Sequence, residues 1–233
     1  MTTFSFHPVK TITTGEGGAV LTNDETLARR CRRFRSHGIV RSPEDFVQQP
    51  AGLDGTPIAQ SAEVSPWYYE MQELGFNYRI TDFQCALGEV QLSRLESFIR
   101  RRAEIVLRYD DSFMSLATGK LSPHATSGLD LDRLNYSPED IAWHLYVLQL
   151  DFVRLRKTRS RAMAELRSKG IGSQVHYIPV HLQPYYRRKY GYSPGKCPVA
   201  EAYYARALSL ALYPAMTDTE IERVITAVLE ISK

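Results

Sequence analysis

Apolar residues near the start of the chain follow a strand pattern and then a helical one. Short apolar runs at residues 3–6 and 17–22 stand on either side of a glycine-rich turn, which predicts two strands. Residues 24–35 repeat apolar side chains at helical spacing after Asn23-Asp24, and Gly38 follows as a stop signal. The first 38 residues are therefore expected to form two strands and one helix.

The next segment has no hydrophobic period. Residues 41–75 hold four prolines, and Trp67-Tyr68-Tyr69 lies near their end, a pattern typical of a functional loop or of an arm that crosses to a partner. Thr81-Asp82 then begins an apolar helical period that continues toward Leu107. We expect one long helix there, connecting two parts of the chain.

After a polar loop at residues 115–140, short strands alternate with helices. Strands are predicted at 143–150, 173–177 and 211–213, and helices at 159–169, at 198–208 and from a capping box at 217–220 onward. This order of elements predicts an α/β part followed by an α+β part.

Composition excludes several classes of protein. The chain has 233 residues, of which 43% are hydrophobic and 24% charged, as in globular domains. No apolar run approaches the roughly 18 residues of a membrane span, and the first residues lack a signal-peptide pattern. We therefore expect a soluble, cytoplasmic chain without a membrane partner. Cys31, Cys85 and Cys197 are too widely spaced for a disulfide framework or a zinc site, so buried free thiols are expected, with Cys85 in a helix core.

The net charge does not point to a nucleic-acid partner. The 29 basic and 26 acidic side chains leave a balance of +3, which is too small to imply one. Arginines cluster at residues 29–35 and 100–102, where helical spacing favours solvated helix faces. A basic nucleic-acid surface stays open as the alternative.

Lys10 stands out chemically, because the next lysine along the chain is Lys120. It follows a predicted strand, with the hydroxyl of Ser5 five residues before it and a glycine-rich turn after it. A lysine held in such a confined site can lose its proton near neutral pH and add to a carbonyl group, forming a Schiff base. Spacing alone favours the simpler alternative of a surface lysine at the end of a hairpin.

The string around Lys10 is more specific than its spacing. Residues 4–18, Phe-Ser-Phe-His-Pro-Val-Lys-Thr-Ile-Thr-Thr-Gly-Glu-Gly-Gly, closely resemble the cofactor-lysine motif of the DegT/DnrJ/EryC1/StrS sugar aminotransferases, which are fold-type I enzymes that use pyridoxal phosphate. The resemblance continues at residues 35–38, 75–88 and 144–146. It implies the C-terminal part of a fold-type I transferase: a remnant of the large α/β domain at 1–38, an interface arm and connecting helix at 39–114, and a small α+β domain at 115–233.

The resemblance also implies roles for individual residues. Lys10 would bind pyridoxal phosphate covalently and act as the base that moves the substrate proton, and Ser5 would donate to the cofactor phosphate. Asn77, with Arg79 close by, would reach across a dimer interface to the partner's cofactor phosphate and substrate. The nucleotide-sugar pocket would be lined by Gln174, Val175, His176 and Tyr177.

Each of these roles has a simpler alternative. Asn77 could be a turn residue, Ser5 a strand hydroxyl and His176 a core histidine. His176 and His181 are expected on opposite faces of an extended segment, so no shared metal site is predicted.

The resemblance implies a homodimeric aminotransferase that moves an amino group from glutamate to the C4 ketone of a UDP-linked 4-keto-6-deoxy sugar. Residues 174–181 and 190–192 look most like the branch that serves pseudaminic acid biosynthesis. The lysine at position 10 favours the aminotransferases over the dehydratase branch, which has histidine there.

The resemblance covers only the later half of the family. The glycine-rich helix start that grips the phosphate, the aromatic residue on the ring and the aspartate at the pyridine nitrogen are not found in this sequence. The chain is therefore expected to be inactive alone. A non-catalytic module that binds a nucleotide sugar through residues 174–177, or regulates another protein, is the alternative function.

Overall fold

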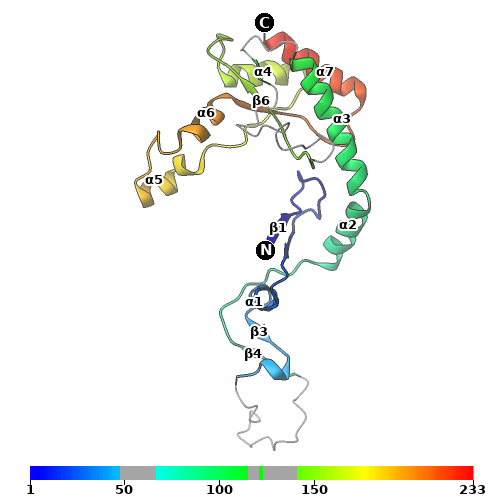
Figure 1. The fold of residues 1–233 in the computed structure, drawn as a ribbon, viewed down its shortest axis with the longest axis vertical. Coiled ribbons are helices and arrows are strands. Elements are labelled where there is room, and N and C mark those ends of the chain that lie inside the picture. Colours follow the sequence, from blue (N-terminus) through cyan, green and yellow to red (C-terminus); the bar gives the residue numbers. More distant parts are fainter. Residues whose placement is uncertain (48–66, 115–120, 123–140, 233) are drawn as a thin grey trace, which may run out of the picture. The chain divides into compact units, whose positions relative to one another are not determined.

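The computed structural model describes residues 1–47, 67–114, 121–122 and 141–232 (Figure 1). The chain divides into two compact units, Met1–Leu92 and Ser93–Lys233. Among the described residues, no helix is long and apolar enough to cross a membrane.

The first unit begins with an antiparallel pair of strands. Strand β1 (Thr2–Ser5) pairs with β2 (Gly18–Leu21), so that Ser5 lies opposite Gly18. Glycine is needed at position 18, because a Cβ there would lie 2.7 Å from the carbonyl oxygen of Phe4. Both strands lie where the apolar pattern predicted them.

Helix α1 (Glu25–Arg35) follows β2 and confirms the third predicted element. The carboxylate of Asp24 accepts a hydrogen bond from the backbone N–H of Leu27, at 3.0 Å, and so caps the first turn. Gly38 ends the turn after the helix with a φ of +70°, a conformation that glycine adopts readily. Local signals therefore set both ends of this helix.

The predicted arm contains a small hairpin. Strand β3 (Ile39–Val40) pairs with β4 (Glu70–Met71), and a short 3₁₀ helix, η1 (Pro43–Asp45), follows β3. The buried carboxylate of Glu70 accepts hydrogen bonds from the backbone N–H of Val47, the Tyr68 hydroxyl and the Gln72 amide. The rest of the arm, at residues 48–66, lies outside the described residues.

The predicted connecting helix is two helices. Helix α2 (Asp82–Ser93) ends before Arg94, and α3 (Leu95–Met114) begins after it. Neither glycine nor proline lies at the break, and nothing in the structure explains it. Cys85, which was expected in a core, is exposed on α2, as is Cys197 elsewhere in the chain, so the prediction of buried thiols is wrong for these two.

The second unit is built around a three-stranded antiparallel sheet of order β5-β6-β7. Its strands and helices are β5 (Leu121–Ser122), β6 (Tyr146–Leu150), α4 (Arg159–Ser168), η3 (Val180–Leu182), α5 (Pro184–Tyr190), α6 (Pro198–Arg206), β7 (Ala207–Leu210) and α7 (Asp218–Ile231). Helices α3 and α4 both pack against α7 (Figure 1). Most of the predicted loop at 115–140 lies outside the described residues.

A continuous apolar core lies between these elements. Tyr109 and Phe113 of α3 contact Tyr146 of β6 through their rings, with centroids 4.9 Å apart for Tyr109 and Tyr146. Leu208 of β7 and Ile221 of α7 are also fully buried in this cluster. The predicted capping box of α7 is present between Thr217 and Glu220.

Two predicted strands differ from the observed ones. The strand expected at 211–213 lies instead at Ala207–Leu210, whose four residues are all buried beside β6. The strand expected at 173–177 reduces to one bridge, between Gln174 and Ser209. Pairing with distant segments, which local apolar pattern does not encode, decides both outcomes.

Candidate functional site

The backbone loop that carries Lys10 joins β1 to β2 and is closed by hydrogen bonds at its base. The N–H of Phe6 donates to the carbonyl of Gly17 at 2.9 Å, and the N–H of Thr14 donates to the carbonyl of Phe6 at 3.0 Å. Within the loop, the N–H of Lys10 donates to the carbonyl of His7 at 2.9 Å, which forms a tight turn. Lys10 is thus half-buried, in a turn of a loop whose two ends are joined by backbone hydrogen bonds.

The Thr-Thr-Gly-Glu-Gly-Gly part of the motif makes this base compact. Thr14 is buried, and its hydroxyl donates to the carbonyl of Glu16 at 2.8 Å. A Cβ on Gly17 would lie only 2.3 Å from the Thr14 hydroxyl oxygen, and Gly15 has a φ of +80°. These positions explain why the loop carries glycines on both sides of Glu16.

Helix α2 packs against the base of the same loop. The Gln84 side-chain amide donates to the carbonyl of Glu16 at 2.7 Å. The Thr14 methyl group approaches Gly88 so closely that a Cβ on Gly88 would lie 2.9 Å from it. The structure therefore brings together the strings at 4–18 and 75–88, which are 57 residues apart in the sequence.

Asn77 and Arg79 lie on the segment that leads into α2. Asn77 forms an isolated bridge with Ser36, and the flanking N–H groups of Phe76 and Tyr78 donate to the carbonyls of Phe34 and Arg35. The backbones approach so closely that a Cβ on Gly75 would lie 2.2 Å from the Gly38 nitrogen. This contact brings the string at 35–38 to the string at 75–88 and leaves Asn77 and Arg79 exposed.

Ser5 is the last residue of β1 and is exposed. Its hydroxyl oxygen accepts a long hydrogen bond, of 3.5 Å, from the N–H of His7. That bond uses the oxygen as an acceptor, so the hydroxyl proton is available to another acceptor. Ser5 ends β1 and Lys10 lies in the loop that follows, so both residues belong to the same hairpin.

The other four predicted site residues lie in the second unit, between α4 and η3. Gln174 exchanges two backbone hydrogen bonds with Ser209 of β7, of 3.1 and 2.8 Å. His176 Nδ1 lies 2.7 Å from the Ser209 hydroxyl, and its ring meets that of Tyr177 edge-on. Val175 is half-buried and Tyr177 is exposed, so β7 anchors this stretch while the Tyr177 ring reaches solvent.

His176 and His181 have separate partners. His176 faces Ser209, whereas His181 lies in η3 with its Nε2 2.8 Å from the Glu201 carboxylate. The carboxylate also accepts from the N–H groups of Gly195 and Cys197, and these bonds, with His181, hold the pKa of Glu201 below its usual value. The described ranges contain no group of three or more His, Cys, Asp or Glu side chains placed to hold a metal ion.

The structure adds residues that sequence reasoning did not single out. Gln84 supports the Lys10 loop and lies inside the recognised string at 75–88, which was a usable signal. Ser209 anchors both Gln174 and His176, but it lies 33 residues beyond His176 and no local pattern marks it. The partnership of His181 and Glu201 likewise spans 20 residues.

Two arginines of the second cluster make contacts within their own unit. Arg101 pairs with Asp218, with Nη2 and Oδ1 2.9 Å apart. Arg102 is buried and donates to the carbonyl of Leu212 at 2.8 Å. Two of the three arginines at 100–102 are thus used within the fold, which weakens the nucleic-acid alternative.

The chain has clear relatives among curated proteins. It is 38% identical over 230 residues to Uncharacterized protein MJ1066 of Methanocaldococcus jannaschii, a match of 99% of this chain and 53% of the relative. It is 37% identical over 233 residues to Spore coat polysaccharide biosynthesis protein SpsC of Bacillus subtilis, a match of 100% and 54%. The chain therefore spans about half the length of these curated relatives.

Solved structures share the fold. Helicobacter pylori PseC, an aminotransferase involved in the biosynthesis of pseudoaminic acid, matches with a TM-score of 0.76 and 27% identity, over 98% of this chain and 52% of PseC. The PLP-form of the putative sugar aminotransferase Spr1654 from Streptococcus pneumoniae matches with a TM-score of 0.73 and 27% identity, over 99% of this chain and 51% of that protein. These matches confirm the predicted mixed helix-and-sheet architecture of a partial fold-type I transferase.

The family assignment rests on almost the whole chain. The sequence profile of the DegT/DnrJ/EryC1/StrS aminotransferase family matches residues 1–229. This range includes the string around Lys10 and every other motif from which the resemblance was inferred. The chain therefore belongs to the DegT/DnrJ/EryC1/StrS aminotransferase family.

Proposed function

We propose that this chain takes part in a pyridoxal phosphate-dependent transfer of an amino group from glutamate to the C4 ketone of a UDP-linked 4-keto-6-deoxy sugar, in the route to pseudaminic acid or a related amino sugar. The observation that carries the proposal is the Lys10 loop, which is closed at its base and packed on α2. Such a loop presents one primary amine in a defined place, as a lysine nucleophile requires.

The residues of the first unit fit the cofactor chemically. Lys10 offers an amine, Ser5 a hydroxyl proton without an acceptor among the described residues, and Arg79 an exposed guanidinium. Amine, hydroxyl and guanidinium groups suit an aldehyde that carries a phosphate. Pyridoxal phosphate, when bound, supplies the aldehyde that exchanges amino groups and the ring that accepts electrons from the broken C–H bond.

Two side chains of the hairpin would then have distinct tasks. Lys10 would hold the cofactor through Nζ and act as the general base that moves a proton from the amino-bearing carbon of glutamate. Ser5 would donate its hydroxyl proton to a phosphate oxygen. The closed base of the loop would hold the Lys10 amine and the Ser5 hydroxyl at fixed positions relative to each other. Such positioning is a large part of catalysis.

The second unit would contribute residues that bind the nucleotide sugar. His176 is fixed by Ser209, and Tyr177 projects beside it with 69% of its surface exposed. A fixed histidine next to an exposed aromatic ring can orient a polar ligand and stack on a flat one. We propose that Gln174, Val175, His176 and Tyr177 bind the substrate in this way.

A second copy of the chain is the proposed partner. Along β4 and its flanks, Tyr68, Glu70 and Gln72 share a hydrogen-bond network, while the alternate residues Trp67, Tyr69 and Met71 are more than half exposed. Alternation of this kind puts the apolar side chains on one face of a strand. We propose that this face docks on a second copy and that Asn77 and Arg79 complete that copy's cofactor site.

Reductive trapping tests the function. The protein is mixed with pyridoxal phosphate, treated with borohydride and digested, and labelled peptides are identified by mass spectrometry. We expect the label on the peptide that contains Lys10, loss of that label in Lys10→Arg, and no change in Lys169→Ala, whose lysine pairs with Glu230. A label spread evenly over the lysines would contradict the proposal.

A non-catalytic nucleotide-sugar-binding or regulatory module is the second candidate. It is favoured by the position of residues 174–177 in a unit with its own core. We also propose that residues 1–233 alone do not turn over substrate, because the phosphate-gripping helix start and the ring-pairing aspartate expected for the family are not found among them. Binding of a UDP-sugar without any labelling of Lys10 would favour this second function.

A further inference from the structure

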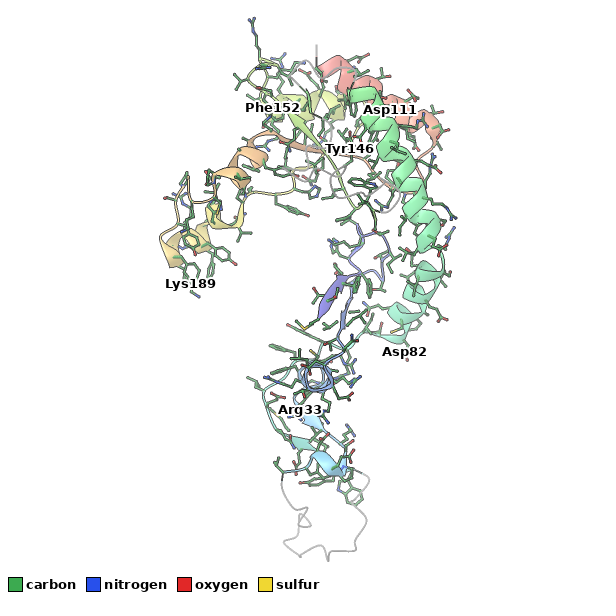
Figure 2. All side chains as sticks on the ribbon, in the orientation of Figure 1. Arg33, Asp82, Asp111, Tyr146, Phe152 and Lys189 are labelled. Atoms are coloured by element: carbon green, nitrogen blue, oxygen red, sulfur yellow. The ribbon has the colours of Figure 1, made fainter. Side chains whose placement is uncertain are left out.

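Helix α2 and the turn before it meet the Lys10 loop through one row of residues. Ile80, Gln84 and Gly88 follow one another at intervals of four, the spacing that places side chains on one face of a helix. Figure 2 shows the side chains of this part of the chain, with Asp82, the first residue of α2, labelled. All three members of the row approach the base of the loop, so this face of the helix supports it.

The two outer members of the row make apolar contacts. A Cβ on Gly17 would lie 3.3 Å from the terminal carbon of the Ile80 side chain. A Cβ on Gly88 would lie 2.9 Å from the Thr14 methyl group. Apolar contacts are non-directional, so these two bring the loop close to α2 without selecting one orientation.

Gln84, in the middle of the row, supplies a directional contact. Its side-chain nitrogen donates to the carbonyl of Glu16 at 2.7 Å. Its side-chain oxygen accepts from the N–H of Thr81 at 3.0 Å and from the Thr81 hydroxyl at 3.1 Å. The partners determine which end of the amide is which, because a carbonyl needs a donor and an N–H group needs an acceptor. The two ends of this amide therefore have two different partners.

The contacts between Thr81 and Gln84 form a capping box at the start of α2. The N–H of Gln84 lies 3.4 Å from the Thr81 hydroxyl, which completes the reciprocal pair. A capping box accepts Glu or Gln at this position, because it uses only a side-chain oxygen. An ionised carboxylate cannot donate, so only Gln can also bind the Glu16 carbonyl. The choice of Gln over Glu thus serves the loop and not the helix.

We propose that Gln84 is a positioning residue for Lys10, whose loop it holds on α2 in one orientation through its side-chain nitrogen. The Glu16 carbonyl also accepts from the Thr14 hydroxyl at 2.8 Å, so one donor from the loop and one from the helix converge on the same oxygen. The inference rests on the proposed function for the role of Lys10. It gives Gln84 a task beyond capping α2.

Hydrogen exchange tests the position of the loop without the cofactor. Gln84→Glu keeps the capping box and loses the donor. Its amides at residues 6–17 should exchange about fivefold faster than those of the parent chain at neutral pH, the effect of one hydrogen bond on local opening. The amides at residues 84–92 should keep their parent rates.

Gln91→Glu is the matched control, because it makes the same change farther along α2, outside the capping box. It should alter exchange in neither segment. Equal loop exchange in Gln84→Glu and the parent chain would overturn the proposal. Faster exchange in both segments of Gln84→Glu would also overturn it, because the residue would then act through the helix alone.

A lower pH should rescue the loop in Gln84→Glu. A protonated carboxyl group has one donor and one acceptor, so it can reproduce both contacts of the amide. We expect the excess loop exchange of the variant to shrink as pH falls from 7 toward the ordinary Glu pKa of about 4. The titratable groups nearby, which are those of His7, Lys10, Glu16 and Asp82, are the same in both chains. An excess that does not change with pH would contradict the assigned donor.

Reductive labelling connects the loop to the chemistry. Gln84→Glu should lose the cofactor label on Lys10 severalfold, and Gln91→Glu should be labelled as the parent chain is. A fully labelled Gln84→Glu would overturn the positioning role and leave the proposed function in place. A parent chain without label on Lys10 would remove the proposed function, whereas the exchange experiment decides independently whether Gln84 holds the loop.

Discussion

The first unit holds its candidate lysine with almost no buried apolar surface, whereas the second unit is built on a continuous apolar core. Among the described residues of the first unit, Val40 is the one buried hydrophobic side chain, and Phe4, Val20 and Phe83 are exposed. The second unit buries apolar side chains of α3, α4, α7, β6 and β7 in one cluster. The Lys10 loop is thus stabilised by hydrogen bonds and close backbone packing, whereas the second unit is stabilised by its apolar core.

The largest expected effect is a core truncation in the second unit. Leu148→Ala removes a fully buried side chain of β6 and should lower the free energy of unfolding by about 2–5 kcal/mol. Val20→Ala, at a half-exposed position on β2, should cost less than about 1 kcal/mol. Urea unfolding followed by circular dichroism measures both, and equal losses would contradict the contrast between the units.

A pair of neighbouring arginines gives the next effect. Arg102→Met leaves the buried carbonyl of Leu212 without its donor and should cost about 1–3 kcal/mol. Arg101→Met removes exposed ion pairs to Asp218 and Glu104 and should cost less than about 1 kcal/mol, with a loss that shrinks as salt rises. The same unfolding assay at two salt concentrations distinguishes them.

A glycine substitution in the Lys10 loop should act locally. Gly17→Ala places a Cβ against the hydroxyl of buried Thr14, which is held by Glu16, so the loop must distort. We expect a severalfold loss of cofactor label on Lys10, with the unfolding of the second-unit core unchanged. Gly172→Ala, which has open space around it, should change neither. A label that survives Gly17→Ala would show that the compact base does not position Lys10.

The smallest expected effect is a pH dependence inside the second unit. Burial raises the pKa of Asp110, which accepts a hydrogen bond from the Tyr146 hydroxyl at 2.7 Å. A raised pKa in the folded state means that this carboxyl group stabilises the fold most at low pH and loses that contribution as pH rises through its folded pKa. Asp110→Asn should therefore gain stability relative to the parent chain as pH rises above the ordinary Asp pKa.

Asp111→Asn is the matched control for that measurement. Asp111 is adjacent and exposed, and its charge contributes less than burial to the raised pKa of Asp110, so its substitution should change the pH dependence of unfolding less than Asp110→Asn does. Urea unfolding from pH 4 to 7 measures both variants. A parent chain and Asp110→Asn with parallel pH profiles would contradict the role of burial.

The sequence alone determined the features that depend on neighbouring residues. Helix α1 begins and ends where Asp24 and Gly38 predicted, and α7 begins at its capping box, because caps are local hydrogen bonds. The strings around Lys10 and at 75–88 indicated the family, since they contain the residues that form the Lys10 loop and the start of α2, which packs against it. These features need no knowledge of distant contacts.

Only the tertiary structure decided which distant segments meet. No local sequence pattern around Ser209 predicts that it pairs with Gln174 and His176. The buried position of Ala207–Leu210 depends on the register of this strand with β6. The bond between His181 and Glu201 likewise forms only once η3 and α6 are folded together. The same holds for the stacking of the Tyr186, Tyr190 and Tyr192 rings. The physical reason is that such pairings gain their free energy from packing and hydrogen bonds across long loops, which a local pattern of residues does not contain.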